Sequence, residues 1–129
     1  MSVFHSFDVS ASGMTAHRRW MDVIASNLAN AESTRTTAGG PFRRKLVTFM
    51  EDGLGVALRS IEDDPAPPRL VYDLSHPDAD ENGYVAYPNI DPVQELVDMI
   101  SATRAYEANV AAFNAAKGML LRAMEMGRA

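Results

Sequence analysis

The chain has 129 residues, of which 47% are apolar and 22% are charged, and it carries a net charge of −5 at neutral pH. This composition is typical of one modest globular domain and excludes an intrinsically disordered chain. The absence of cysteine excludes disulfides and thiolate chemistry, and the negative charge gives no electrostatic reason to expect a nucleic-acid partner.

The N-terminus lacks a basic flank followed by an unbroken apolar core, so we expect no cleavable signal peptide. No apolar run approaches the roughly 20 residues that a membrane-spanning helix needs. We therefore expect no direct membrane insertion.

Proline divides the chain into three parts. All seven prolines lie between Pro41 and Pro92, and proline is excluded from helix interiors because it lacks the N–H donor and clashes with the preceding turn. Acidic and basic side chains balance in residues 1–35 and 93–129, so the middle, with five basic against ten acidic residues, holds the whole negative excess. This partition predicts two terminal helices around a non-helical insert.

The first helix is predicted over residues 4–30. Large apolar residues recur at intervals of seven from Phe7 to Leu28, which places a narrow apolar stripe on a helix about 40 Å long. Gly13 lies in the first turns, where glycine costs about 1 kcal/mol relative to alanine. We therefore expect an interruption of the helix there.

The middle is predicted to form short strands over residues 43–50, 56–61 and 69–72, bounded by glycine and proline. The basic cluster Arg43-Arg44-Lys45 begins the first strand. Because the surrounding segment is acidic, we interpret this cluster as a solvated strand face rather than a nucleic-acid site.

The acidic stretch DADENG, residues 78–83, matches four positions of an EF-hand calcium loop. The position that requires a bidentate glutamate is Asn89, and two nearby prolines oppose the flanking helices of such a site. The favoured interpretation is a tight turn in which Asn82 and Gly83 supply the positive φ angles.

No other chemistry is predicted. The three histidines have no metal-ligand spacing, and no serine lies in a nucleophile elbow with an assignable histidine partner. A phosphate-cradling glycine loop is also absent from the sequence. We expect no catalytic residue, metal, cofactor or small-molecule substrate.

The last helix is predicted to begin at Asp91-Pro92, an N-cap residue followed by proline at the first helical position, and to end near Gly127. Its length of about 34 residues corresponds to roughly 50 Å. An apolar seam at alternating steps of three and four follows Leu96, Met99, Thr103, Tyr106, Val110, Phe113, Lys117, Leu120 and Met124.

A second apolar face is predicted on the same helix, formed by Val93, Val97, Ile100, Ala108, Ala111, Ala112, Ala115 and Leu121. One interpretation is a helical hairpin in which the two terminal helices simply pack together within a monomer. The other is that the apolar surface is wider than one partner helix covers, so that neighbours from other chains are needed.

Two stretches carry a family resemblance. SASGMTAHRRWMDVIASNLANAEST, residues 10–34, resembles the N-terminal signature of flagellar axial proteins, the family of rod and hook subunits. GYVAYPNIDPVQELVDMISATRAYEANVAAFNAAKGMLLRAM, residues 83–124, is similar to their C-terminal signature. The middle segment and the short length are similar to those of the proximal-rod members.

The resemblance implies an α+β fold. Long N- and C-terminal helices, residues 1–35 with 91–129, would form a coiled-coil-like helical assembly domain, and residues 36–90 a small β-rich outer domain. It also implies a non-enzymatic structural subunit of the proximal rod of the flagellar basal body. Such subunits are exported without cleavage by the flagellar type III apparatus and polymerise with themselves and other rod subunits into the periplasm-spanning drive shaft.

The residues expected at the assembly interface come from both helices: Met14, Met21, Ile24, Asn27, Leu28, Asn30, Leu96, Met99, Ile100, Tyr106, Asn109, Val110, Phe113 and Leu120. In one interpretation the amides of Asn27 and Asn30 bond across to a neighbouring helix and select the assembly register. In the other, Asn30 ends its helix in the left-handed conformation.

Two alternatives to this function are a soluble coiled-coil adaptor or chaperone that binds one partner, and another rod subunit of the same family. An enzyme would rest only on unassigned acidic residues near His76.

Overall fold

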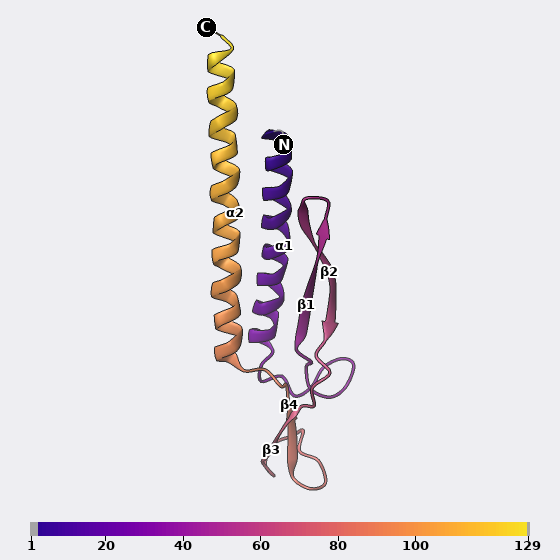
Figure 1. Cartoon of the computed structure of the whole chain (residues 1–129). Coiled ribbons are helices and arrows are strands. Elements are labelled where there is room, and N and C mark those ends of the chain that lie inside the picture. The colour runs from indigo at the N-terminus through magenta and orange to yellow at the C-terminus, as the bar shows by residue number, and fades with distance from the viewer. Residues whose placement is uncertain (1–2, 129) are drawn as a thin grey trace.

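The computed structural model describes residues 3–128. In chain order the elements are α1 (Val3–Ala29), β1 (Lys45–Asp52), β2 (Gly55–Asp63), β3 (Arg69–Tyr72), β4 (Tyr84–Tyr87) and α2 (Pro92–Met126), as Figure 1 shows. The strands form two separate two-stranded antiparallel sheets, β1–β2 and β3–β4. The predicted α+β class, with two long terminal helices around a small β insert, is confirmed.

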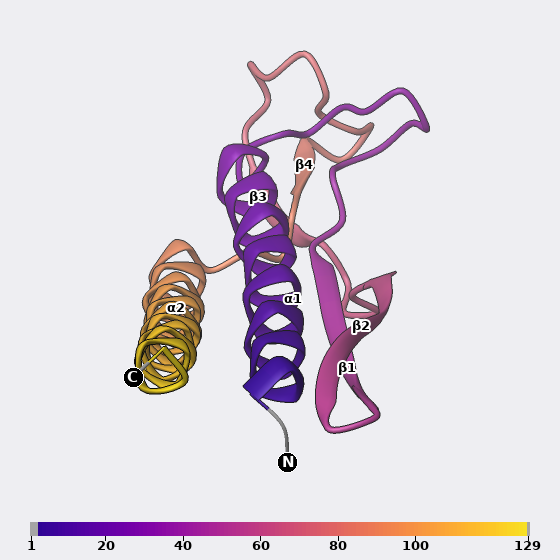
Figure 2. The same ribbon diagram turned by 90° about the horizontal axis from the view of Figure 1, so that it is seen from above.

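Helix α1 lies at the centre of the molecule. Helix α2 runs antiparallel to it on one side, and the β1–β2 hairpin lies along its other side (Figures 1 and 2). The β3–β4 sheet lies beyond the end of α1 where α2 begins (Figure 1). Helix α1 is therefore covered on two sides, whereas among the described helices and strands α2 packs on α1.

Helix α1 is continuous over 27 residues, so the expected interruption at Gly13 is wrong. Gly13 is buried, and a Cβ atom there would lie 2.4 Å from Oδ1 of Asn109 on α2. The missing side chain therefore allows close approach of the two helices, and the packing offsets the low helix propensity of glycine.

The expected left-handed exit at Asn30 is also wrong, because every residue with positive φ in the described part of the chain is a glycine. The Asn30 side chain instead donates to the carbonyl of Ser26 at 2.9 Å. The same carbonyl also accepts a hydrogen bond from the backbone N–H of Asn30 at 3.1 Å, so Asn30 bonds back to the last turn of the helix through both its side chain and its backbone.

Helix α2 begins and ends as predicted. The carboxylate of Asp91 accepts a hydrogen bond from the backbone N–H of Val93 at 3.0 Å, and Pro92 occupies the first turn. After 35 residues the backbone N–H of the C-cap residue Gly127 bonds to the carbonyl of Ala123 at 3.1 Å.

The β1–β2 hairpin packs on α1 through aromatic and polar contacts. Phe49 on β1 stacks on His17 with ring centroids 5.4 Å apart and meets the edge of Trp20 at 5.7 Å. The Ser12 hydroxyl accepts a hydrogen bond from the backbone N–H of Val56 at 3.2 Å. The predicted strands 43–50 and 56–61 differ from β1 and β2 by one or two residues at each end, whereas β3 matches its prediction.

The turn before β4 is built by Asp80 and Gly83. The Asp80 carboxylate accepts from the backbone N–H groups of Asn82 and Tyr84, both at 2.9 Å. Only Gly83, at φ +86°, has the positive φ that was expected of Asn82 as well. The turn prediction is therefore correct in place but wrong in its type.

The core is thin and made largely of small side chains. Its buried apolar residues are Ala16 and Ile24 of α1, Ala102 and Ala116 of α2, and Val85 and Ile90 between β3 and α2 in the chain. Because alanine removes little apolar area from water, this core is modest for two helices of such length. In the part of the chain that the structure describes, neither helix combines the length and hydropathy needed to cross a lipid bilayer.

Candidate assembly interface

The inner face of α2, which contacts α1, holds the two helices in one antiparallel register. The ring of Phe113 lies 4.9 Å from that of Phe7 near one end of the pair. Further along, the Thr103 hydroxyl donates to the sulfur of Met21 at 3.5 Å. The predicted seam therefore packs within the monomer over most of its length.

A buried amide links three elements where α1 ends and α2 begins. The Asn27 side chain donates to the carbonyl of Lys45 at 3.0 Å and accepts from the backbone N–H of the same residue at 2.9 Å. It also donates to the Glu95 carboxylate at 3.3 Å. Both side chains are 1% exposed, so the amide joins α1, β1 and α2 in one network.

Arg44 extends this network. Its guanidinium donates to the buried carboxylate of Glu95 and forms ion pairs with Asp64 at 3.5 Å and Asp98 at 3.6 Å. Burial of the guanidinium lowers its pKa, but the hydrogen bonds and charges of Glu95 and Asp64 outweigh this, so the pKa of Arg44 is raised overall. The expected solvation of the basic cluster is correct for exposed Arg43 and wrong for Arg44, and both residues lie just before β1 rather than on a strand face.

The outer face of α2 is left uncovered within the described chain. All eight residues predicted for the second apolar face are exposed: Val93, Val97, Ile100, Ala108, Ala111, Ala112, Ala115 and Leu121. Leu96 belongs with them, because it is 53% exposed although the seam pattern assigned it to the inner side. A large apolar side chain that stays exposed on a helix already paired on its other side indicates a further partner.

The structure divides the predicted interface residues into two sets. Ile24 and Asn27 are buried and ten others are half-buried: Met14, Met21, Leu28, Asn30, Met99, Tyr106, Asn109, Val110, Phe113 and Leu120. The other two predicted interface residues, Leu96 and Ile100, are exposed on the outer face. The amides of Asn27, Asn30 and Asn109 are all bonded within the chain. That of Asn109 donates to the carbonyl of Ala105 at 2.8 Å. Asn27 does reach a neighbouring helix, but one of its own chain.

Sequence reasoning missed the charged residues of the network. Glu95 lies one residue before the predicted seam position Leu96, and Asp64 and Asp98 lie in segments far apart in the chain. The seam pattern placed Leu96 rather than Glu95 on the inner side of the helix, so periodicity gave no signal that Glu95 is buried. Nothing in the sequence identified Arg44 as its partner.

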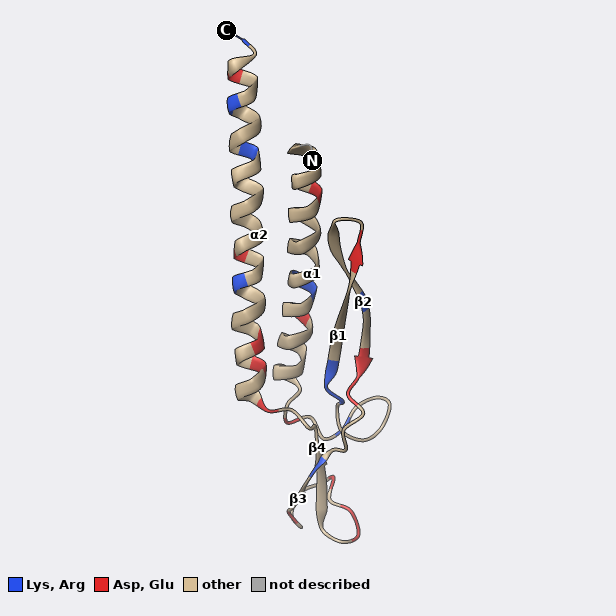
Figure 3. Cartoon of the chain, viewed as in Figure 1, with Lys and Arg blue, Asp and Glu red and all other residues tan. Residues whose placement is uncertain are grey.

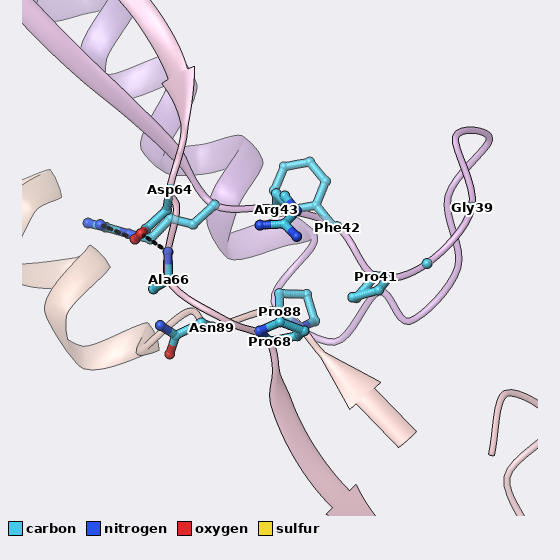
Figure 4. A pocket seen from close by; sticks show the side chains of 11 residues that line it. Gly39, Pro41, Phe42, Arg43, Asp64, Ala66, Pro68, Pro88 and Asn89 are labelled. Atoms are coloured by element: carbon cyan, nitrogen blue, oxygen red, sulfur yellow. Dashed lines mark hydrogen bonds and ion pairs between the residues drawn. The ribbon is translucent and has the colours of Figure 1, made fainter. Parts of the chain in front are cut away.

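The loop before β1 bounds a hollow of about 200 Å³ whose lining residues Figure 4 shows. They include Arg43, Asp64, Pro68, Pro88 and Asn89, but no histidine, serine or lysine. Since the Asp64 carboxylate is paired with Arg44, the hollow offers no free acid–base or nucleophile pair.

Two residues of the EF-hand-like stretch, Asp78 and Asp80, use their carboxylates within the chain. Asp78 accepts from the hydroxyl of Thr34 at 2.7 Å and pairs with Arg35. The hydrogen bonds from Thr34 and Arg35 lower the pKa of Asp78. Among residues 3–128, no three His, Asp or Glu side chains are grouped so that they could hold a metal ion.

Two family models match the chain. The family described as "Flagella basal body rod protein" matches residues 7–35, and "Flagellar basal body rod FlgEFG protein C-terminal" matches residues 81–126. The matches cover α1 and α2 and leave out β1, β2 and β3.

Full-length relatives are similar as well. The flagellar basal-body rod protein FlgC of Bacillus subtilis (strain 168) is 44% identical over 150 residues, covering 99% of this chain and 100% of the relative. FlgC of Salmonella typhimurium is 40% identical over 134 residues, with 99% and 100% covered. FlgC of Aquifex aeolicus is 46% identical over 132 residues, with 97% of each chain covered.

Proposed function

This chain belongs to the FlgC family of flagellar basal-body rod proteins and is a structural subunit of the rod, and we propose that it polymerises through the outer face of α2. The observation that carries this proposal is the row of exposed apolar side chains on that face, from Val93 to Leu121. Buried against neighbouring subunits, this row would supply the apolar area that the thin monomer core lacks.

The total surface supports the same proposal. The chain exposes 8737 Å². A compact monomer of its mass, 14.1 kDa, exposes about 6,700 Å². The excess of roughly 2,000 Å² is of the size that specific protein–protein interfaces bury.

We propose that the two terminal helices, residues 1–35 with 91–129, form the assembly domain and that residues 36–90 lie outside it. The inner-face residues would act indirectly, because they hold α1 and α2 in register and so present Leu96 and Ile100 to the neighbour. The proline-free ends and their balanced charge support this division, since close packing of many like-charged helices is unfavourable.

The remaining proposals concern the cellular context. The chain would be exported uncleaved by the flagellar type III apparatus, assemble with itself and other rod subunits in the periplasm-spanning proximal rod, and have no enzymatic activity. It would act without nucleic acid, small-molecule substrate, cofactor or membrane insertion. The supporting observations are the family membership and the lack of an unpaired catalytic group in the hollow bounded by Arg43 and Asp64.

The test is a charge placed on the outer face. Leu96→Asp should abolish swimming in soft agar and remove the chain from purified hook–basal bodies, because a carboxylate would be buried without a partner between subunits. The thermal unfolding of the purified chain should stay nearly unchanged, because Leu96 is exposed in the monomer.

Two further variants complete the design. Thr48→Asp places the same charge at an exposed position of β1, away from the outer face of α2, and should leave swimming intact. Phe113→Asp should lower both stability and swimming, because Phe113 packs on Phe7 within the chain. Normal swimming of the Leu96→Asp strain would contradict the proposal.

A further inference from the structure

The β3–β4 sheet presents an outer face that is apolar throughout. Tyr72 is paired with Tyr84 and Leu70 with Ala86 across the strands, so these four side chains share one face. On the opposite face, Val71 is half-buried and its pair Val85 is fully buried. A two-stranded sheet with one solvated face ordinarily carries polar residues there.

The exposure of this face is large. Leu70, Tyr72 and Tyr84 are 63%, 59% and 43% exposed, and Leu74, which follows β3, is 68% exposed. Tyr72 and Leu74 close over Gly83, where a Cβ atom would lie 2.8 Å and 2.6 Å from their side chains. The face is therefore an ordered platform of four large side chains, and we name Leu70, Tyr72, Leu74 and Tyr84 the tyrosine platform.

The platform lies in an acidic segment. Residues 69–87 contain the carboxylates of Asp73, Asp80 and Glu81, besides that of Asp78, which is paired with Arg35. The basic side chain in this range is that of Arg69. Arg69 lies over the ring of Tyr87, 5.0 Å from its centroid, and so is engaged on the opposite face of the sheet. An apolar platform with an acidic surround favours a partner that is both apolar and basic.

The last turns of α2 have that chemistry. Ala116 is the last buried residue of the helix, and every residue from Leu121 to Arg128 is exposed. Met119, Leu121, Met124 and Met126 supply large apolar side chains. In residues 117–128, three basic side chains stand against one acidic side chain.

The two surfaces lie at opposite ends of the molecule. In Figure 1 the free end of α2 projects past the start of α1, and the β3–β4 sheet lies at the other extreme. Figure 3 shows acidic residues at the start of α2, the end nearer the β3–β4 sheet, and both acidic and basic residues along the rest of the helix. Lys117, Arg122 and Arg128 lie toward the free end, with Glu125 among them. When copies stack with the same polarity, the free end of one faces the sheet of the next.

We propose that the tyrosine platform is the seat for the free end of α2, residues 117–128, of a second copy of this chain. The contact is axial and joins successive subunits, whereas the outer face of α2 joins lateral neighbours. This inference rests on the proposed function, since it names the partner surface within the same assembly. Methionine suits the contact because its unbranched side chain adapts to an aromatic surface and its sulfur interacts favourably with rings.

A glycan strand of peptidoglycan is the other occupant to consider for an exposed tyrosine pair. Its peptide stems carry carboxylates, which the acidic surround of the platform repels. The free end of α2 has no such conflict, so the charges favour the second copy.

The test uses the absence of cysteine from the chain. Leu70→Cys and Met124→Cys single variants, mixed at high protein concentration and mildly oxidised, should form a mixed disulfide several-fold faster than Thr48→Cys mixed with Met124→Cys. Thr48 is exposed on β1, away from the platform. Added salt should slow the cross-link, and Arg122→Glu in the Met124→Cys chain should slow it as well, because both weaken the attraction to the acidic surround.

Equal cross-linking rates for the platform and control pairs would overturn the inference. Protection of Leu70→Cys from a soluble thiol reagent by peptidoglycan fragments, without the mixed disulfide, would overturn it in favour of the glycan. The proposed function fails separately, if the unmodified chain does not co-purify with hook–basal bodies. A chain that enters the rod but gives no Leu70–Met124 cross-link keeps the proposed function and loses this inference.

Discussion

The two ends of the helix pair differ in how their side chains are used. At the end where α1 stops and α2 starts, Asn27, Arg44 and Glu95 form a network in which every described buried side-chain N or O atom has a partner. At the other end, α2 extends past α1 and its residues from Leu121 to Arg128 are exposed. We name the first of these the junction end, and the second holds the free end of α2, residues 117–128.

The difference shows how one short chain combines a defined fold with exposed apolar surface that neighbouring subunits can bury. Buried polar groups have few satisfactory geometries, so the junction end fixes the relative placement of the helices and β1. Apolar side chains on the free end and outer face impose no such geometry within the monomer and remain available to neighbours.

The largest effect is expected at the junction end. Arg44→Ala should lower the free energy of unfolding by about 3 kcal/mol, because it leaves the buried Glu95 carboxylate without its charged partner. Thermal or denaturant unfolding of the purified chain measures this change. Arg43→Ala removes an exposed neighbouring charge and should change stability by no more than about 0.5 kcal/mol. Equal effects of the two variants would show that the network does not hold the junction.

Between the two ends, the close approach of the helices can be tested with two glycines. Gly13→Ala should lower stability by about 1 kcal/mol, because displacing Asn109 outweighs the roughly 1 kcal/mol gained in helix propensity. Gly118→Ala, where a new Cβ meets nothing within 4 Å, should instead raise it. The measurement is chemical unfolding, and Asn109→Ala should rescue the Gly13→Ala chain. Stabilisation by Gly13→Ala would contradict the packing of Asn109 at this site.

A smaller effect is expected for the loops near the junction end. The pKa of Asp78 is lowered by hydrogen bonds from Thr34 and Arg35. Its folded pKa thus lies below its unfolded value of about 3.9. The stabilisation from this carboxylate is then fully present above that value and is lost as the pH falls through the folded pKa. Asp78→Asn should accordingly weaken the fall in melting temperature between neutral and strongly acidic pH. An unchanged pH dependence would show that the loop contact contributes nothing.

The smallest effect on stability is expected at the free end. Deleting the chain from Arg122 onward should change the free energy of unfolding by no more than about 0.5 kcal/mol, because the removed side chains are exposed in the monomer. The same deletion should impair entry into hook–basal bodies. A large loss of monomer stability would show that the free end is held within the chain and would remove the contrast between the two ends.

Several features of the fold could be predicted because they depend on local chemistry. The proline partition located both helices, and the Asp91-Pro92 start of α2 is confirmed by the bond from the backbone N–H of Val93 to the Asp91 carboxylate. The second apolar face was also predicted from periodicity, and the structure confirms that all its members are exposed on the outer side of α2. Periodicity did not show which apolar side of α2 faces α1, so Leu96 was assigned to the wrong side.

By itself, the sequence determined the class of fold, the place of each helix, and the excess of apolar surface on α2. Only the tertiary structure decided that Gly13 is a contact site, that Asn27 bonds within its own chain, and that Arg44 pairs with Glu95. The physical reason is that helix propensity, capping and apolar periodicity act between residues a few positions apart. The contact partners of Asn27 and Arg44 are 18 to 68 positions away, and folding alone brings them together.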